Sequence, residues 1–165
     1  MYKKNEEEND KMKKKVYQDK VLYTIAWSPV YKFDKYSITK IIPELAGIVA
    51  IMEKHSGETY HYILFYSCWR DGMRLGLKNL LDPIFTRHPD LAKAMEGREL
   101  LYKYTVVDTN PFDLQDVLWW LIQNYQPELN DINNYIHSQR YKEIYVREME
   151  LSKETVVERL PKFGF

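Results

Sequence analysis

Three basic side chains recur at helical spacing near the middle of the chain. Arg70, Arg74 and Lys78 are separated by four residues each, a spacing that places side chains along one face of an α-helix. Such a row can bind phosphate groups, and one guanidinium can donate two hydrogen bonds to a phosphate. The same row is typical of the solvated face of a surface helix. These residues could therefore bind phosphate, and the plainer interpretation is an exposed helix face.

The other side chains that commonly carry chemistry form no recognisable motif. The chain has one cysteine, Cys68, which excludes an internal disulfide and a cysteine-rich zinc site. No histidine stands near it in a nucleophile pattern, so we expect a small packed residue. The four histidines do not pair at the spacing of metal ligands. We therefore expect no metal site and no cofactor.

The segments that precede the basic residues are predicted to be strands. Residues 46–54 are β-branched and apolar, residues 59–67 are apolar and aromatic, and the "HSGE" segment between them contains a turn-forming glycine. A turn this short joins antiparallel strands, so the two segments should form a hairpin. A helical pattern then runs over residues 69–81 and stops at Pro83.

Two further elements complete the predicted core. Residues 98–107 are predicted to form a third strand. Residues 113–125 give the clearest helix, because apolar side chains line one face, with Asp113 as the expected N-cap and Pro127 beyond the end. The three strands should form one antiparallel sheet, with both helices packed against it.

Length and charge favour a single domain that carries a charged tail. The chain has 165 residues, which is sufficient for one well-packed core. Residues 1–20 hold seven lysines and five acidic residues with few apolar ones, so we expect a tail. Residues 21–130 would be the main domain, and residues 131–165 an extension packed on it. Over residues 131–150 helix and strand patterns compete, and Ser152 could cap a short terminal helix.

Charge and hydropathy argue against two classes of function. The net charge is zero, and residues 21–165 hold 17 basic and 19 acidic side chains. Because affinity for nucleic acid comes mainly from basic patches, tight binding is not expected. No apolar run approaches the roughly 18 residues that span a bilayer, and the first 15 residues lack the apolar segment of a secretory signal. We therefore expect a cytoplasmic protein without membrane contact.

The order of the predicted elements, together with three short motifs, resembles the GIY-YIG nuclease superfamily. In "IPELAGIVAI", Gly47 to Val49 are similar to the first motif of that family, and in "LFYSCWRD", Phe65 to Ser67 stand where the second is expected. "LIQNYQPELN" resembles the Pro-x-x-Asn ending of the later helix, with Asn130 as its asparagine. The resemblance covers residues 27–130. It implies an α+β fold with a small three-stranded antiparallel sheet flanked by helices, to which the C-terminal extension would be added.

The resemblance also implies a metal-dependent phosphodiesterase, but the reactive groups are missing. In that family, tyrosines on the first two strands activate water, an arginine on the first helix holds the phosphate, and a glutamate on the later helix binds a divalent metal. Here Val49 and Phe65 stand at the tyrosine positions, and neither can accept a proton. Arg74 lies one residue from the arginine position, and Leu118 stands at the glutamate position. We therefore expect no catalytic residues.

Three interpretations remain open. The first is a catalytically inactive GIY-YIG-like domain, a pseudoenzyme, that acts as a binding or assembly module for a protein partner or for weakly bound nucleic acid. The second is a divergent endonuclease that acts on DNA with Mg²⁺. An alternative register, which takes Tyr62 as the start of the second motif, would restore one tyrosine to it. The third is an unrelated α+β domain that shares only the order of elements.

Overall fold

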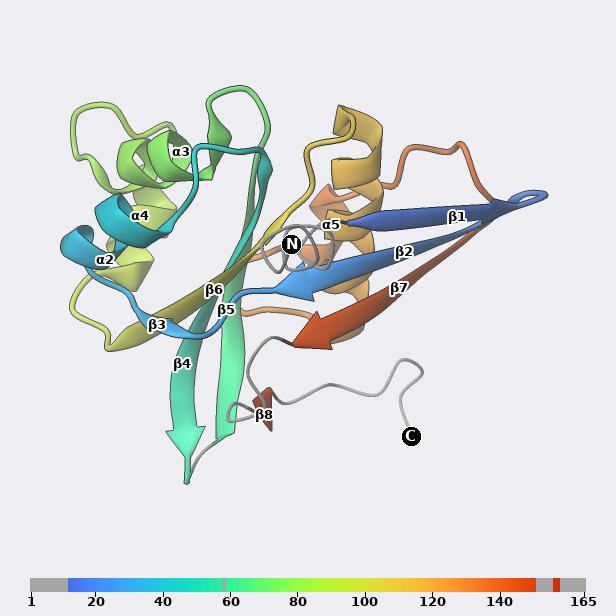
Figure 1. Cartoon of the computed structure of the whole chain (residues 1–165). Helices are drawn as coiled ribbons and strands as arrows, with labels where there is room; N and C mark the ends of the chain where they lie inside the picture. Colours follow the sequence, from blue (N-terminus) through green and yellow to red (C-terminus); the bar gives the residue numbers. More distant parts are fainter. Residues whose placement is uncertain (1–11, 58, 151–155, 158–165) are drawn as a thin grey trace, which may run out of the picture.

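Two β-sheets form the framework of the protein (Figure 1). The structure, a computed structural model, describes residues 12–57, 59–150 and 156–157. The larger sheet, sheet B, has the strand order β3 (Tyr31–Lys32), β6 (Leu100–Val106), β4 (Gly47–Ser56), β5 (Thr59–Cys68), β8 (Val156–Val157). The smaller sheet, sheet A, has the strand order β1 (Lys13–Tyr17), β2 (Lys20–Trp27), β7 (Glu143–Glu150).

The predicted hairpin and third strand form the centre of sheet B. Strand β4 pairs antiparallel with β5 on one side and with β6 on the other, so the predicted antiparallel pairing is confirmed. The α+β class is also confirmed. The expected size of three strands is wrong, because β3 and β8 extend the sheet at its two edges. Each of these edge strands has two residues, which is too short to leave a periodic pattern in the sequence.

Helices cover both faces of sheet B. One face packs against α2 (Lys35–Ile41), α3 (Gly72–Leu81) and α4 (Pro89–Met95). The other face packs against α5 (Pro111–Tyr125), which also contacts sheet A, and Figure 1 shows the two groups of helices on opposite sides of β4. Side chains of β4 enter both cores in alternation, which explains why this strand is a continuous apolar run. Among the described helices, none is long and apolar enough to cross a membrane.

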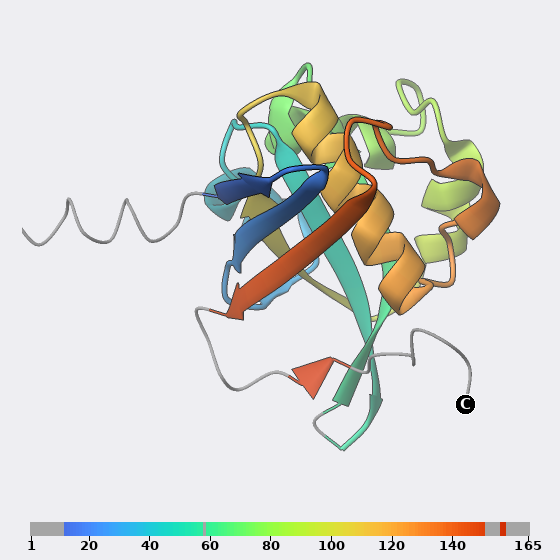
Figure 2. The same ribbon diagram turned by 90° about the vertical axis from the view of Figure 1, so that its right-hand side faces the viewer.

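Sheet A corrects the expectation of a charged tail for residues 12–20, whereas residues 1–11 of that predicted tail lie outside the described residues. Residues 13–17 form β1, which pairs antiparallel with β2. All five of its residues are exposed, so the strand leaves no apolar signal in the sequence. Backbone bonds to β2 and the ion pair of Lys14 with Asp113 hold it in place. On the other side of β2 lies β7, in parallel register, which resolves the ambiguity over residues 131–150 in favour of a strand. Figure 2 shows the three strands side by side with α5 behind them.

Two predicted ends of helices also need correction. The N-cap of α5 is Asn110, whose side chain accepts a hydrogen bond from the Asp113 amide, and not Asp113 itself. Pro111 fits the first helical position because no hydrogen bond is needed from its nitrogen. A terminal helix capped by Ser152 is contradicted where β8 forms, and the rest of that segment lies outside the described residues.

Candidate functional site

The structure separates the two tyrosine positions of the resemblance. Val49 lies in the core between sheet B and α3, with no exposed surface. Phe65 lies in the opposite core beside α5 and is 1% exposed. The residue paired with Val49 across the hairpin is Tyr66, whereas Phe65 pairs with Ala50. Side chains at positions 49 and 65 therefore point to opposite faces of the sheet.

The other two positions are divided in the same way. Leu118 is 9% exposed and packs in the core with Phe65. Arg74 lies on α3, on the far side of the sheet, where its Nε donates to the Ile42 carbonyl oxygen and its Nη1 to Glu44 Oε1, both at 2.8 Å. The four motif positions therefore share no cleft.

Gly47 and Asn130 have structural roles. A Cβ atom on Gly47 would lie 2.2 Å from the carbonyl oxygen of Thr105 and 2.8 Å from Met73 Sδ, so β4 and β6 can approach only around a glycine. Asn130 bonds to both backbone groups of Phe65: it accepts from the amide at 2.8 Å and donates to the carbonyl at 3.0 Å. Its side chain thereby forms the two hydrogen bonds with Phe65 that the backbone of a neighbouring strand would otherwise form.

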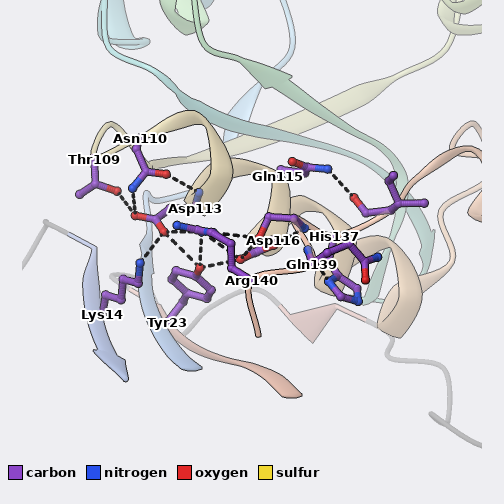
Figure 3. A network of polar contacts seen from close by, with 12 residues as sticks. Lys14, Tyr23, Thr109, Asn110, Asp113, Gln115, Asp116, His137, Gln139 and Arg140 are labelled. Atoms are coloured by element: carbon purple, nitrogen blue, oxygen red, sulfur yellow. Dashed lines mark hydrogen bonds and ion pairs between the residues drawn. The ribbon is translucent and has the colours of Figure 1, made fainter. Parts of the chain in front are cut away.

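The densest polar cluster of the described chain lies at the start of α5 (Figure 3). Asp113 and Asp116 are 1% and 0% exposed, and Figure 3 shows Lys14 and Tyr23 reaching them from sheet A. Arg140 Nη2 donates to Asp113 Oδ1 at 2.9 Å and to Asp116 Oδ2 at 3.1 Å, and Lys14 Nζ lies 2.9 Å from Asp113 Oδ1. Two carboxylates thus face two cations.

The pKa values of this cluster indicate that the Asp113 carboxylate stays charged and the Tyr23 hydroxyl stays protonated. Burial alone would raise the pKa of Asp113, but hydrogen bonds from Thr109, Lys14 and Arg140 outweigh burial and leave that pKa lowered. Burial and the hydrogen bond to Asp116 raise the pKa of Tyr23. Each carboxylate is saturated by donors, so we interpret the cluster as a structural joint between sheet A and α5.

A second buried cluster surrounds Lys103. Its Nζ donates to Glu150 Oε1 at 2.8 Å and lies 4.7 Å from the centre of the Trp27 ring. Burial lowers the pKa of Lys103, while Glu150 opposes that shift. Tyr62, the tyrosine of the alternative register, belongs to this cluster and is 5% exposed. Because Lys103 itself is 1% exposed, its amino group is not accessible to a ligand.

A pocket of about 270 Å³ opens where β5 runs into α3. We name it the arginine pocket. Its lining includes cationic, aromatic and hydroxyl side chains: Tyr66, Ser67, Trp69, Arg70, Phe85, Arg87 and His88. Cys68 also lines it, but burial and then the charge of Asp71 raise the pKa of its thiol to about 12, which disfavours the nucleophilic thiolate. Its expected role as a packed residue is confirmed.

The arginines of the arginine pocket have no carboxylate partner within the described chain. Arg70 and Arg87 form no ion pair with any described residue, whereas Arg74, Arg98 and Arg140 are each held by carboxylates. The single acidic side chain in the lining is Asp71. The pocket therefore presents unneutralised guanidinium groups, which suit an anion.

Exposed aromatic rings accompany these arginines. Trp69 is 39% exposed and Phe85 is 69% exposed. The Tyr66 ring lies 6.2 Å from the ring of His88 in an edge-on arrangement. Burial raises the pKa of Tyr66, although the charge of Arg87 acts in the opposite direction. Rings and guanidinium groups together can bind a planar group that carries a negative charge.

The predicted row of Arg70, Arg74 and Lys78 does not exist. Helix α3 begins at Gly72, which has a φ of 79°, so Arg70 precedes the helix and turns into the arginine pocket. Arg74 is bound to Glu44, and Lys78 is exposed beside it in the lining of a separate pocket. Arg87, His88 and Phe85 were missed because they lie in a loop, where residue spacing carries no signal.

Among the described residues, no group of three or more His, Cys, Asp or Glu side chains is arranged to hold a metal ion. No curated protein and no solved structure matches the chain. The model of a family described as "Uncharacterised protein" matches residues 11–163, which is nearly the whole chain. The chain therefore belongs to this family of uncharacterised proteins.

Proposed function

We propose that this protein is a catalytically inactive domain of the GIY-YIG type that serves as a binding module. One support is the order β4, β5, α3, β6, α5, in which β4 is the central strand of an antiparallel trio. This order agrees with the sheet that the resemblance implies, if β3 and β8 are additions at its edges. Another support is Asn130, which follows α5 and holds the backbone of the second-motif strand.

The observation that carries the proposal is the burial of the motif positions in two separate cores. Val49 belongs to one core, and Phe65 and Leu118 belong to the other. A nuclease of this type needs its water-activating groups, its phosphate clamp and its metal ligand around one phosphate. Apolar side chains on opposite faces of a sheet cannot supply these functions, whichever metal is added.

The arginine pocket supports binding of a phosphate-bearing ligand, and we propose nucleic acid. Arg70 and Arg87 would hold a phosphate, while Trp69 or Phe85 would stack on a base. A net charge of zero implies modest affinity that depends strongly on salt.

A cleavage assay tests the absence of catalysis. Purified protein is incubated with labelled plasmid and with RNA over a series of Mg²⁺ and Mn²⁺ concentrations, and we expect no cleavage. The opposite result is cleavage that co-purifies with the protein and is lost in Arg74→Ala or Tyr62→Phe. That result would support the divergent endonuclease and overturn the inactive domain.

A binding assay tests the arginine pocket. The anisotropy of a fluorescent single-stranded oligonucleotide is measured at several salt concentrations with the variant Arg70→Ala/Arg87→Ala. Loss of two phosphate contacts should reduce the log–log salt slope by about 1.4. The matched control, Lys32→Ala/Lys54→Ala, removes the same charge from exposed positions outside the pocket. An equal effect of both variants would show that net charge acts rather than this pocket.

A further inference from the structure

The outer face of sheet A carries cations and rings that the proposed function does not use. Alternate residues of the sheet point away from α5, because Lys14 and Tyr23 point toward it and their neighbours along each strand face outward. The residues on this outer face are Lys13, Lys15, Tyr17, Lys20, Leu22, Thr24, Glu143, Tyr145, Arg147 and Met149.

The strand register arranges these side chains in rows across the sheet. Lys13 pairs with Thr24, which pairs with Arg147, so one row has a cation at each end. The next row runs from Lys15 through Leu22 to Tyr145. Neighbouring rows are about 6.7 Å apart and neighbouring strands about 4.8 Å apart. Cations and an aromatic ring therefore lie in neighbouring rows on one face of the sheet.

The charge on this face is largely uncompensated. Its one described carboxylate, Glu143, lies 3.0 Å from Lys20 Nζ. Lys13, Lys15 and Arg147 form no ion pair with any described residue. The next acidic residues of β7, Glu148 and Glu150, point inward and are bound there. The face therefore offers three free positive charges.

Exposed rings distinguish this face from an ordinary protected edge. Lysines on an edge strand commonly prevent pairing with other chains, which would account for Lys13 and Lys15. The same role can account for Arg147, because β7 is the other edge strand of sheet A. It does not explain Tyr17 and Tyr145, which are 70% and 45% exposed on the same face as the cations. Rings at such positions can stack on unpaired bases while the cations contact phosphates.

We propose that the outer face of sheet A binds single-stranded nucleic acid. Lys13, Lys15 and Arg147 contact the backbone phosphates, and Tyr145 stacks on a base. This surface is separate from the arginine pocket, so either surface can fail its test without the other. An acidic peptide satisfies the cations but leaves the rings without a function, and a duplex hides the faces of its bases.

Fluorescence anisotropy with a labelled 12-nucleotide single strand tests the proposal at several salt concentrations. The variant Lys13→Glu/Lys15→Glu/Arg147→Glu should weaken binding at least tenfold. Its alanine equivalent should lower the log–log salt slope by about 2. Tyr145→Ala should weaken binding roughly 5- to 150-fold without changing that slope. The control Lys32→Ala/Lys54→Ala/Lys93→Ala removes as much charge from other exposed sites and should retain most of the affinity.

Several outcomes overturn the proposal. The proposal is overturned if the variant Lys13→Glu/Lys15→Glu/Arg147→Glu binds like the wild type. It is also overturned if binding is lost only in Arg70→Ala/Arg87→Ala. A 12-base-pair duplex that binds as tightly as the single strand excludes base stacking. Equal competition by poly-glutamate with no effect of Tyr145→Ala indicates an acidic protein partner. Unchanged thermal unfolding midpoints establish that the variants are folded. Cleavage of the oligonucleotide would refute the proposal that the domain is catalytically inactive, but it would not contradict binding at the outer face of sheet A.

Discussion

Replacement of Asp116 by asparagine tests the polar joint between sheet A and α5 most directly. The carboxylate accepts hydrogen bonds from Tyr23 Oη, from the Ser138 amide and hydroxyl, and from Arg140. Asparagine preserves the volume but presents an NH₂ group in place of one oxygen. At least one donor must then face another donor, and the ion pair with Arg140 is lost.

The magnitude follows from these contacts. If the amide oxygen takes the place of Oδ2, three hydrogen bonds lose the charge of their acceptor, at a loss of about 1 kcal/mol each. The Ser138 amide, which bonds Oδ1, would then be unsatisfied, which adds roughly 1–2 kcal/mol. Arg140 is 30% exposed and can recover part of this through water. We therefore expect the free energy of unfolding to fall by about 3 kcal/mol, a large part of the 5–15 kcal/mol of a typical domain.

Urea unfolding followed by tryptophan fluorescence measures this change, because Trp27 and Trp120 are buried in the same core. The midpoint should fall by about 1.5 M for a slope near 2 kcal/mol/M. Asp108→Asn, an exposed position shortly before α5, provides the matched control and should leave the midpoint unchanged. A shift of less than about 0.5 M for Asp116→Asn would refute the assignment of Asp116 to the joint.

Three further predictions concern stability. The pKa of Asp113 is lowered from 3.8, so its contribution to the free energy of unfolding is present above pH 3.8 and is lost as the pH falls below that value. Asp113→Asn should therefore flatten the acid side of a plot of the free energy of unfolding against pH. Lys103→Met should change the free energy of unfolding at pH 7 by less than about 1 kcal/mol, because a buried charge is removed and Glu150 can be solvated. Lys103→Ala should lower it by about 2–4 kcal/mol, because a cavity forms beside Trp27. Urea unfolding measures both changes. Gly47→Ala should lower the thermal midpoint by several degrees through a clash worth about 1–3 kcal/mol. Gly57→Ala meets no neighbouring atom and should lower the midpoint by less, through backbone strain alone at a φ of 59°.

Most elements with long runs of buried apolar side chains were predictable, but β2 was missed although it buries Tyr23, Ile25 and Trp27. Strands β4 and β5 and the helices α3 and α5 carry continuous or periodic apolar residues that reach the core. Strand β1 has no buried residue, so its lysines resemble those of a tail. The partner of β2 is β7, and the 115 residues between them leave no local trace of the pairing.

The candidate site was predicted only in part for two physical reasons. A β-bulge shifts the pairing of β4 with β5 beyond Ile51, so that Tyr62 and Phe65 enter the same core although they are three residues apart. Simple alternation along β5 therefore misjudges which side chains share a face. The arginine pocket draws on Arg70 before α3 and Arg87 in the loop after it, and only the tertiary structure brings the two together.

The parallel pairing of β2 with β7 has a consequence for the order of folding. Sheet A cannot be completed until residues 143–150 are available, by which time the hairpin of sheet B has long been synthesised. Until then the inner face of β2, including Tyr23, Ile25 and Trp27, lacks the neighbouring strand beside which it is buried. Contacts so distant in sequence slow folding and prolong the exposure of apolar edges. A fragment that ends at residue 130 would therefore keep its central hairpin, but it would expose the strand edge and apolar face of β2 and should aggregate with other chains.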